Sequence, residues 1–231
     1  MRTLALALAL LAIPAAAHAQ AYQCSVPQRL DHPPREVRQD GPSRRVAIAS
    51  YTLAVSWSPE YCHGDKSSMQ CSGRNGRFGF VLHGLWPEAR SGPAPQWCSL
   101  TPRPSPALIR QNLCMTPVPW LLEHEWAKHG SCMTRTPEAY FRTSSILWRS
   151  LRWPDADQLS RQQGLTVGDL RRAFAASNPD WRGRRIGVEL SRNGFLRELR
   201  LCYDRRFMPA DCARRSFGPP DSAALKIWRG L

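Results

Sequence analysis

The 231-residue sequence has no long apolar run beyond its first twenty residues. Even the N-terminal run, Leu4 to Ile13, is shorter than the about 20 residues that a transmembrane helix needs. Arg2 precedes that run and Ala17-His18-Ala19 follows it, which is the order of segments in a secretory signal peptide. We therefore expect a signal peptide over residues 1–19, cleaved after Ala19, and an exported protein, periplasmic or secreted, without a membrane span.

Lysine is also nearly missing. Of 32 basic residues only Lys66, Lys128 and Lys226 are lysines, so a lysine at position 128 stands out against an arginine background. The formal net charge is +14, or +13 without Arg2. Such a basic exported domain attracts polyanions, either nucleic acid or anionic surfaces, although many of the arginines could simply solvate the surface.

Ligand spacing for a zinc ion is absent as well. The motif H-E-x-x-H requires histidines four residues apart on one helix face. His124 and His129 are five apart, and Lys128 would place a positive charge beside the metal. The pattern excludes a zinc protease, and we expect neither a metal nor another cofactor.

Cysteine is present in a number that indicates disulfides. All eight cysteines follow residue 19, and an even count in an exported chain favours four disulfides over reactive thiols. Short separations suggest the pairs Cys62–Cys71 and Cys202–Cys212. Counting alone leaves open how the other four cysteines pair, namely Cys24, Cys98, Cys114 and Cys132.

Residue patterns predict strands and helices in irregular order, without internal repeats. We expect one α+β domain over residues 50–231 and a loosely packed N-terminal extension over residues 20–49, rich in Pro, Arg and Asp. The expected elements are strands at Tyr51–Trp57 and Phe78–Leu82, a helix from Thr136-Pro137 to about Arg152 with Tyr140, Ile146, Leu147 and Leu151 as apolar members, a helix opened by the capping-box spacing Thr166–Asp169, and a hairpin of Ile186–Leu190 with Phe195–Tyr203.

The segment Glu123 to Cys132 concentrates groups that can move or neutralise a proton. The segment is predicted to be helical, with Gly130 at the position of a C-terminal cap. At about 100° per residue, an arc of roughly 140° then holds four such side chains: His124, Glu125, Lys128 and His129. The pattern predicts an active-site face. A solvated helix with a Glu125–Lys128 salt bridge is the alternative.

A second segment, His83-Gly-Leu-Trp-Pro87, follows the expected strand at Phe78–Leu82. Together the two segments resemble the two active-site signatures of the ribonuclease T2 family, including the cysteine that closes the second, Cys132. The resemblance extends from about Tyr51 to Cys212 and is strongest to the periplasmic ribonuclease I type of bacteria. It implies a central, mainly antiparallel sheet with packed helices.

The resemblance also implies an activity, which is endonucleolytic cleavage of single-stranded RNA without metal, through a 2′,3′-cyclic phosphate to 3′-phosphate ends. It makes His129 the general base and His83 the general acid, a distinction that the sequence alone does not draw. His124 would bind the phosphate, and Lys128 and Glu125 would stabilise the transition state.

Substrate contacts and the remaining disulfides also follow from the resemblance. Trp86 is expected to stack on an RNA base, although it could be a core tryptophan; Glu88 and Trp97 are weaker candidates. Cys98–Cys132 is the implied disulfide, which leaves Cys24 to pair with Cys114. RNA is the expected substrate, and DNA is expected to bind without being cleaved. The protein is expected to be a monomer.

Two other classes of protein remain as alternatives. A non-catalytic protein that binds RNA or another polyanion on the same fold would be indicated by loss of His83 or His129, and both are present. A secreted metallohydrolase would need a ligand spacing that the histidines do not provide.

Overall fold

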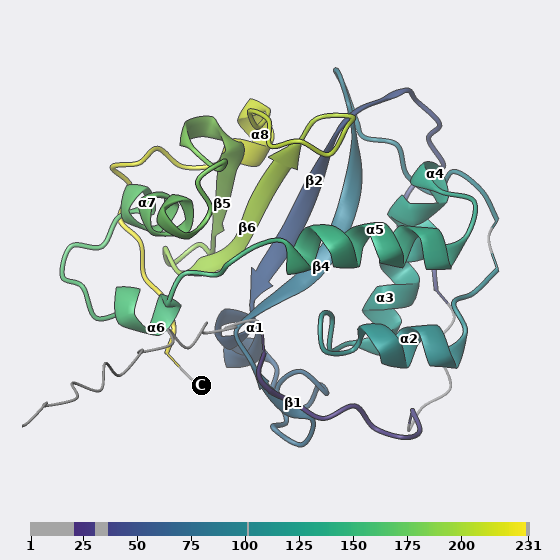
Figure 1. Ribbon diagram of the computed structural model, residues 1–231, viewed down its shortest axis with the longest axis horizontal. Coiled ribbons are helices and arrows are strands. Elements are labelled where there is room, and N and C mark those ends of the chain that lie inside the picture. Colours follow the sequence, from purple (N-terminus) through teal and green to yellow (C-terminus); the bar gives the residue numbers. More distant parts are fainter. Residues whose placement is uncertain (1–20, 31–36, 101, 230–231) are drawn as a thin grey trace, which may run out of the picture.

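A four-stranded antiparallel sheet forms the centre of the molecule (Figure 1). The computed structural model describes residues 21–30, 37–100 and 102–229, so the expected signal peptide lies outside the described residues. The sheet has the order β4-β2-β6-β5, and β1 and β3 form a separate pair. The strands are β1 Ala21–Cys24, β2 Ile48–Trp57, β3 Gly76–Phe78, β4 Phe80–Ala89, β5 Ile186–Leu190 and β6 Leu196–Tyr203.

Helices surround this sheet, and α5 crosses one of its faces (Figure 1). In Figure 1, α2, α3 and α4 lie toward the right of the molecule, and α6 and α7 lie toward the left. The helices are α1 Ser58–Gly64, α2 Pro106–Asn112, α3 Pro119–Glu125, the π-helical turn η1 Trp126–Gly130, α4 Ser131–Met133, α5 Pro137–Arg149, α6 Ala156–Leu159, α7 Val167–Ser177, the 3₁₀ turn η2 Gly183–Arg185 and α8 Arg214–Phe217. The predicted α+β class is confirmed.

The two faces of the sheet differ because side chains alternate along each strand. In β2, Leu53, Val55 and Trp57 are fully buried in the core beneath α5. The register places Trp86, Glu198 and Arg200 on the opposite face of the sheet. That second face carries the candidate site.

Several expected elements are confirmed. The residues Thr166 and Asp169 form the predicted capping box at the start of α7. The hairpin of β5 and β6 also forms, with its tight turn at Gly194, whose φ of 80° suits glycine. The helix after Thr136 ends at Arg149, and Ile146 is 62 % exposed, so its assignment to the apolar face is wrong.

The N-terminal extension contacts the rest of the domain at several points where the structure describes it. β1 pairs with β3, and Cys24 is disulfide-bonded to Cys114. Arg44 and Gln96 exchange two backbone hydrogen bonds, of 2.8 and 3.1 Å. These contacts tie the segment to the domain.

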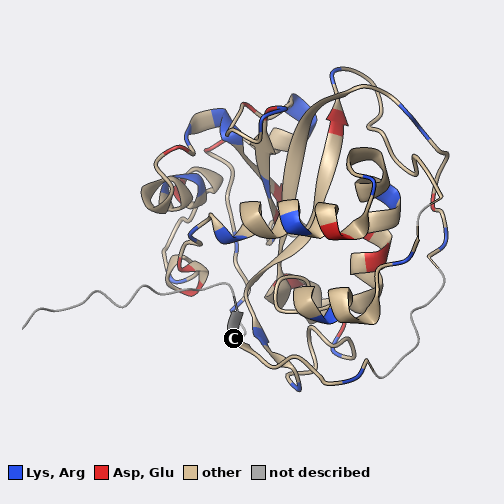
Figure 2. Ribbon diagram, turned by 45° about the vertical axis from the view of Figure 1, so that its right-hand side comes forward, with Lys and Arg blue, Asp and Glu red and all other residues tan. Residues whose placement is uncertain are grey.

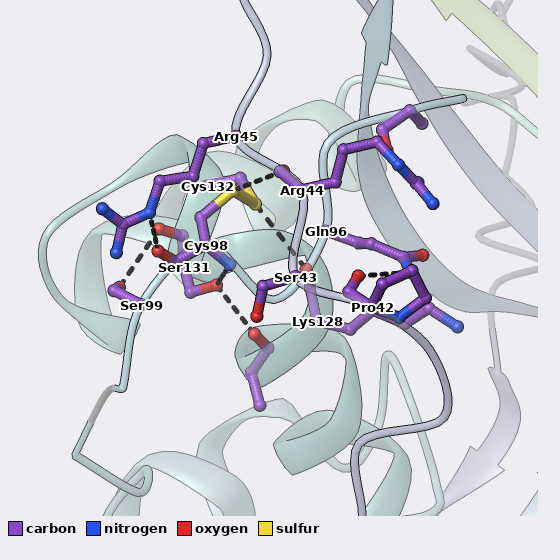
Figure 3. The surroundings of a disulfide bond; sticks show 12 residues. Pro42, Ser43, Arg44, Arg45, Gln96, Cys98, Ser99, Lys128, Ser131 and Cys132 are labelled. Carbon is purple, nitrogen blue, oxygen red and sulfur yellow. Dashed lines mark hydrogen bonds between the residues drawn. A yellow bond between two sulfur atoms is a disulfide. The ribbon is translucent and has the colours of Figure 1, made fainter. Parts of the chain in front are cut away.

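Four disulfides staple the chain, with the pairings given by the sequence analysis: Cys24–Cys114, Cys62–Cys71, Cys98–Cys132 and Cys202–Cys212. Figure 3 shows that Arg44 and Arg45 lie beside the Cys98–Cys132 bond. There Arg45 donates a hydrogen bond of 2.5 Å to the carbonyl oxygen of Cys98. The disulfide joins the loop after β4 to α4, and hydrogen bonds from Arg45 to Cys98 and between Arg44 and Cys98 attach the segment before β2.

The surface carries basic residues on several elements rather than in one stripe (Figure 2). Within residues 21–30, 37–100 and 102–229, no helix has the length and apolar character needed to span a bilayer.

Candidate active site

A β-bulge places His83 on the site face of the sheet. Ala54 pairs with Gly84 and Val55 pairs with Leu82, so His83 is an extra residue without a partner in β2. Such a bulge redirects a side chain and is common beside active sites. β4 continues through this segment to Ala89, which corrects the expectation that the strand ends before His83.

The second segment forms one continuous helical stretch from α3 through η1 to α4. Ser131 N–H donates to the carbonyl oxygen of Trp126, the i→i+5 bond of a π turn, which occurs often at functional sites. Gly130 has helical backbone angles and does not cap the helix. A Cβ at Gly130 would collide with Trp126 and Tyr140, so glycine is needed there for close packing.

Glu125 lies at the centre of the site and is almost completely buried, with 4 % of its side chain exposed. Its Oε2 accepts a hydrogen bond of 2.7 Å from Trp86 Nε1. His83 Nε2 lies 3.5 Å from Oε1, and His129 Nε2 lies 4.0 Å from Oε2. Burial raises the pKa of Glu125 to about 7 against the opposing charge of His83. One carboxylate therefore lies between the two imidazoles.

The two imidazoles have opposite electrostatic surroundings. Burial lowers the pKa of His83, but the charges of Glu125 and Glu198 outweigh burial and raise it above the usual value. Burial lowers the pKa of His129 to about 3, and the positive charge of Lys128 adds to this effect. In the described part of the chain, His129 Nδ1 is buried and lacks a hydrogen-bond partner. At neutral pH, His83 is the ring that retains a proton more readily.

Lys128 and His124 lie beside these groups and face Asp40 from the N-terminal segment. Lys128 Nζ is 2.7 Å and His124 Nε2 is 3.8 Å from Asp40 Oδ2. Burial, together with the charge of Lys128, lowers the pKa of His124. The alternative interpretation, a solvated helix with a Glu125–Lys128 salt bridge, does not hold, because Lys128 pairs with Asp40 instead.

A cavity of about 610 Å³ opens beside His83 and Trp86. Its wall includes Tyr61 and Trp120, which are 43 % and 49 % exposed. The cavity therefore borders the His83 side of the site, and its wall is partly polar and partly aromatic.

Comparison with known proteins identifies the group to which this arrangement belongs. The model of the Ribonuclease T2 family matches residues 48–212, a range that holds both segments and the whole central sheet. The chain belongs to the ribonuclease T2 family. Within the matched range lie all the imidazoles and carboxylates described above except Asp40.

The proteins most similar in sequence that we compare are named as ribonucleases. The chain is 32 % identical to a probable ribonuclease of Haemophilus influenzae over 74 % of this chain and 64 % of that protein, so the match spans just under two thirds of the relative. It is 38 % identical to a ribonuclease of Aeromonas hydrophila, over 67 % and 71 % of the two chains. Among solved structures, RNase NT in complex with 5′-AMP has a TM-score of 0.62 at 18 % identity, with 79 % of this chain and 98 % of that chain covered, which supports the fold.

The five residues predicted to be catalytic come together in the structure, and Trp86 lies among them. Its ring centroid is 5.0 Å from that of His83 and 5.6 Å from that of His129. Arg200 approaches the same ring, with its guanidinium carbon 5.9 Å from the centroid. Trp86 therefore supports Glu125 through its N–H as well as forming part of the cavity wall.

The two weaker candidates lie apart from Trp86's cavity. Glu88 accepts hydrogen bonds from Thr52 and Arg215, of 3.0 and 2.6 Å, at the end of β4. Trp97 is only 8 % exposed, and its ring meets His124 edge-on at 5.4 Å. The structure therefore places Trp97 behind the His124 side of the site, not in the pocket of Trp86.

Two residues in contact with this cluster were missed in the sequence. Glu198 of β6 bonds His83 Nδ1 at 2.9 Å, and Asp40 bonds Lys128. Neither belongs to a local motif. A buried acidic residue in the alternating run Leu196–Tyr203 was the one signal that could have indicated Glu198.

Proposed function

We propose that this protein is an exported endoribonuclease that cleaves single-stranded RNA by transesterification. The observation that carries the proposal is the pair of imidazoles with opposite pKa shifts on two sides of buried Glu125. Acid–base catalysis of a single displacement needs one protonated group and one unprotonated group within reach of the same reacting centre. His83 and His129 meet this requirement near neutral pH.

RNA supplies its own nucleophile, the ribose 2′-OH next to the scissile phosphate. His129, the neutral ring, takes the 2′-OH proton while the 2′-oxygen attacks phosphorus. The bond from phosphorus to the 5′-oxygen breaks, and His83 donates its proton to that leaving oxygen. The products are a 2′,3′-cyclic phosphate and a 5′-hydroxyl. Slow attack of water on the cyclic phosphate, with the two histidines exchanging roles, then gives a 3′-phosphate.

The remaining groups stabilise negative charge on the phosphate. Lys128 brings a compact positive charge, and His124 offers a further donor beside it. Glu125 contributes in its protonated form, which burial favours up to about pH 7, as a donor to a phosphoryl oxygen. No step in this sequence needs a metal ion.

Substrate contacts beyond the phosphate centre on the cavity beside His83. A base that stacks on Trp86 or on exposed Trp120 would contribute about 1–3 kcal/mol. The basic surface would attract RNA and DNA alike, with DNA bound and left uncut because it lacks the 2′-OH (Figure 2). Four disulfides favour an oxidising compartment, the periplasm or the medium, and we expect a monomer.

The test is cleavage of a defined single-stranded RNA in excess EDTA, with the ends of the fragments determined. We expect 2′,3′-cyclic or 3′-phosphate ends with 5′-hydroxyl partners, and no loss of rate from the chelator. The matched control is the same RNA with one deoxynucleotide, which should resist cleavage at that nucleotide alone. Fragments with 5′-phosphate ends, DNA cleavage, or a rate restored only by added metal would reject the proposal.

A further inference from the structure

Glu198 holds the imidazole of His83 from the side opposite Glu125. Its Oε2 lies 2.9 Å from His83 Nδ1, a hydrogen-bond distance, whereas His83 Nε2 is turned toward Glu125. Only 8 % of the Glu198 side chain is exposed, against 33 % for His83. The bond is therefore shielded from water on the Glu198 side and open on the other.

The sheet itself brings these residues together across an intervening strand. Glu198 lies opposite Ser56, and Arg200 lies opposite Ala54, which is fully buried. On the other edge of β2, Ala54 also pairs with Gly84, the neighbour of the bulged residue His83. Small side chains on β2 thus leave room for Glu198 to reach His83 over the strand.

A second contact anchors the carboxylate. Arg200 Nε donates to the other oxygen of Glu198, Oε1, at 2.9 Å, and the guanidinium also pairs with Glu189 on β5. Because each Glu198 oxygen has its own donor, the carboxylate has one orientation. An ionised acceptor at Nδ1 requires that this nitrogen carry hydrogen, which leaves Nε2 as the nitrogen that exchanges a proton.

We infer that Glu198 is a positioning residue for His83. Its carboxylate fixes the ring with Nε2 toward the reacting atoms and favours the protonated ring, which is the form that donates a proton from Nε2. The inference rests on the proposed ribonuclease function. The titratable and charged groups around His83 are Glu125, His124 and His129 on the α3–η1 stretch and Glu198 and Arg200 on β6. The two carboxylates oppose the effect of burial and of Arg200 and keep the pKa of His83 above its usual value.

The decisive variant is Glu198→Gln, which retains an acceptor for the Nδ1 hydrogen but removes the charge. Its His83 pKa, followed by NMR of the ring carbon-bound proton, should fall by about one pH unit, the lower end of the effect of a neighbouring opposite charge. The alkaline limb of kcat/KM should move down in pH by the same amount, while activity at acidic pH is largely retained. Glu198→Ala should also lose the orientation of the ring and reduce kcat at every pH by about 10- to 100-fold.

Glu189→Gln is the matched control, because it removes a carboxylate that also pairs with Arg200 but does not contact His83. It should shift the His83 titration far less than Glu198→Gln. An unmoved His83 titration in Glu198→Gln, or equal shifts in both variants, would overturn the inference. The NMR titration uses no RNA, so failure of the wild-type protein to cleave RNA would reject the proposed function separately.

Discussion

Asp40 and Lys128 form an ion pair within the candidate active site, with 2.7 Å between Oδ2 and Nζ. Eighty-eight residues separate the two in sequence. Asp40 Oδ1 accepts a further hydrogen bond of 3.1 Å from Trp97 Nε1. Under the proposed function, a carboxylate of the protein thus occupies the place where Lys128 would meet a substrate phosphate, and the two anions compete.

Asp40→Asn should therefore bind RNA more tightly, because it removes a negative charge beside the phosphate site and frees Lys128. We expect KM to fall by up to about fivefold, the scale of one partly exposed ion pair. The logarithmic salt dependence should steepen by about 0.7, the value of one added phosphate contact on a single strand. KM measured at several salt concentrations tests this.

Asp157→Asn on α6, which removes an exposed carboxylate paired with Arg161, is the control. An unchanged or raised KM for Asp40→Asn would contradict competition between the carboxylate and the phosphate.

His83→Ala and His129→Ala should each remove nearly all RNA cleavage while leaving the fold intact. Each ring contributes proton transfer worth about 10²- to 10⁴-fold in rate, and loss of either stops the coupled step. Single-turnover rates, with circular dichroism as the check on folding, test this. Retention of more than a few per cent of wild-type turnover by one variant would remove that histidine from the mechanism.

Lys128→Arg should lose most of its activity although it keeps the charge. A planar guanidinium cannot occupy the position of a compact ammonium held between Asp40 and the phosphate site. The matched control is Lys66→Arg, the same replacement at an exposed position. If both variants matched the wild type in kcat/KM, Lys128 would supply only general positive potential.

Glu125→Gln should stabilise the protein at alkaline pH while it reduces activity. The pKa of Glu125 is raised in the folded protein from its usual 4.5 to about 7, so the stability that its protonated form provides is complete below about pH 4.5 and is lost by about pH 7. A neutral amide does not titrate, and above pH 7 the variant should gain about 1–3 kcal/mol in the free energy of unfolding. Urea unfolding at pH 4 and pH 8 measures the difference. An equal effect of the replacement at both pH values would show that burial does not penalise the Glu125 charge.

The pH dependence of kcat/KM should have a wide plateau on the acid side. The low pKa of His129, about 3, keeps the base unprotonated far below neutrality, and the raised pKa of His83 keeps the acid protonated above its usual 6.5. His83 and Glu125 are 3.5 Å apart and titrate as a pair, so the alkaline limb belongs to both. Initial rates from pH 4 to 9 test the shape. A maximum confined to alkaline pH would contradict the assignment of base and acid.

The sequence by itself determined which groups the proposed function assigns to the chemistry, because these groups lie in two short segments of the chain. His83 and Trp86 share one strand, and Glu125, Lys128 and His129 share one helical stretch. Caps, turns and strand alternation are also local, which is why the capping box of α7 and the hairpin of β5 and β6 could be predicted. The i→i+5 turn at Trp126–Gly130 could not, since an α-helical period was assumed there.

Only the tertiary structure decided how these groups are oriented and charged. The bulge at His83 depends on the register between β2 and β4, and the Glu198–His83 and Asp40–Lys128 contacts join residues 115 and 88 positions apart. No periodicity links such distant positions, because their proximity follows from strand pairing and disulfides. The same long-range contacts and the burial that accompanies them separate the pKa values of His83 and His129, which the sequence alone could not tell apart.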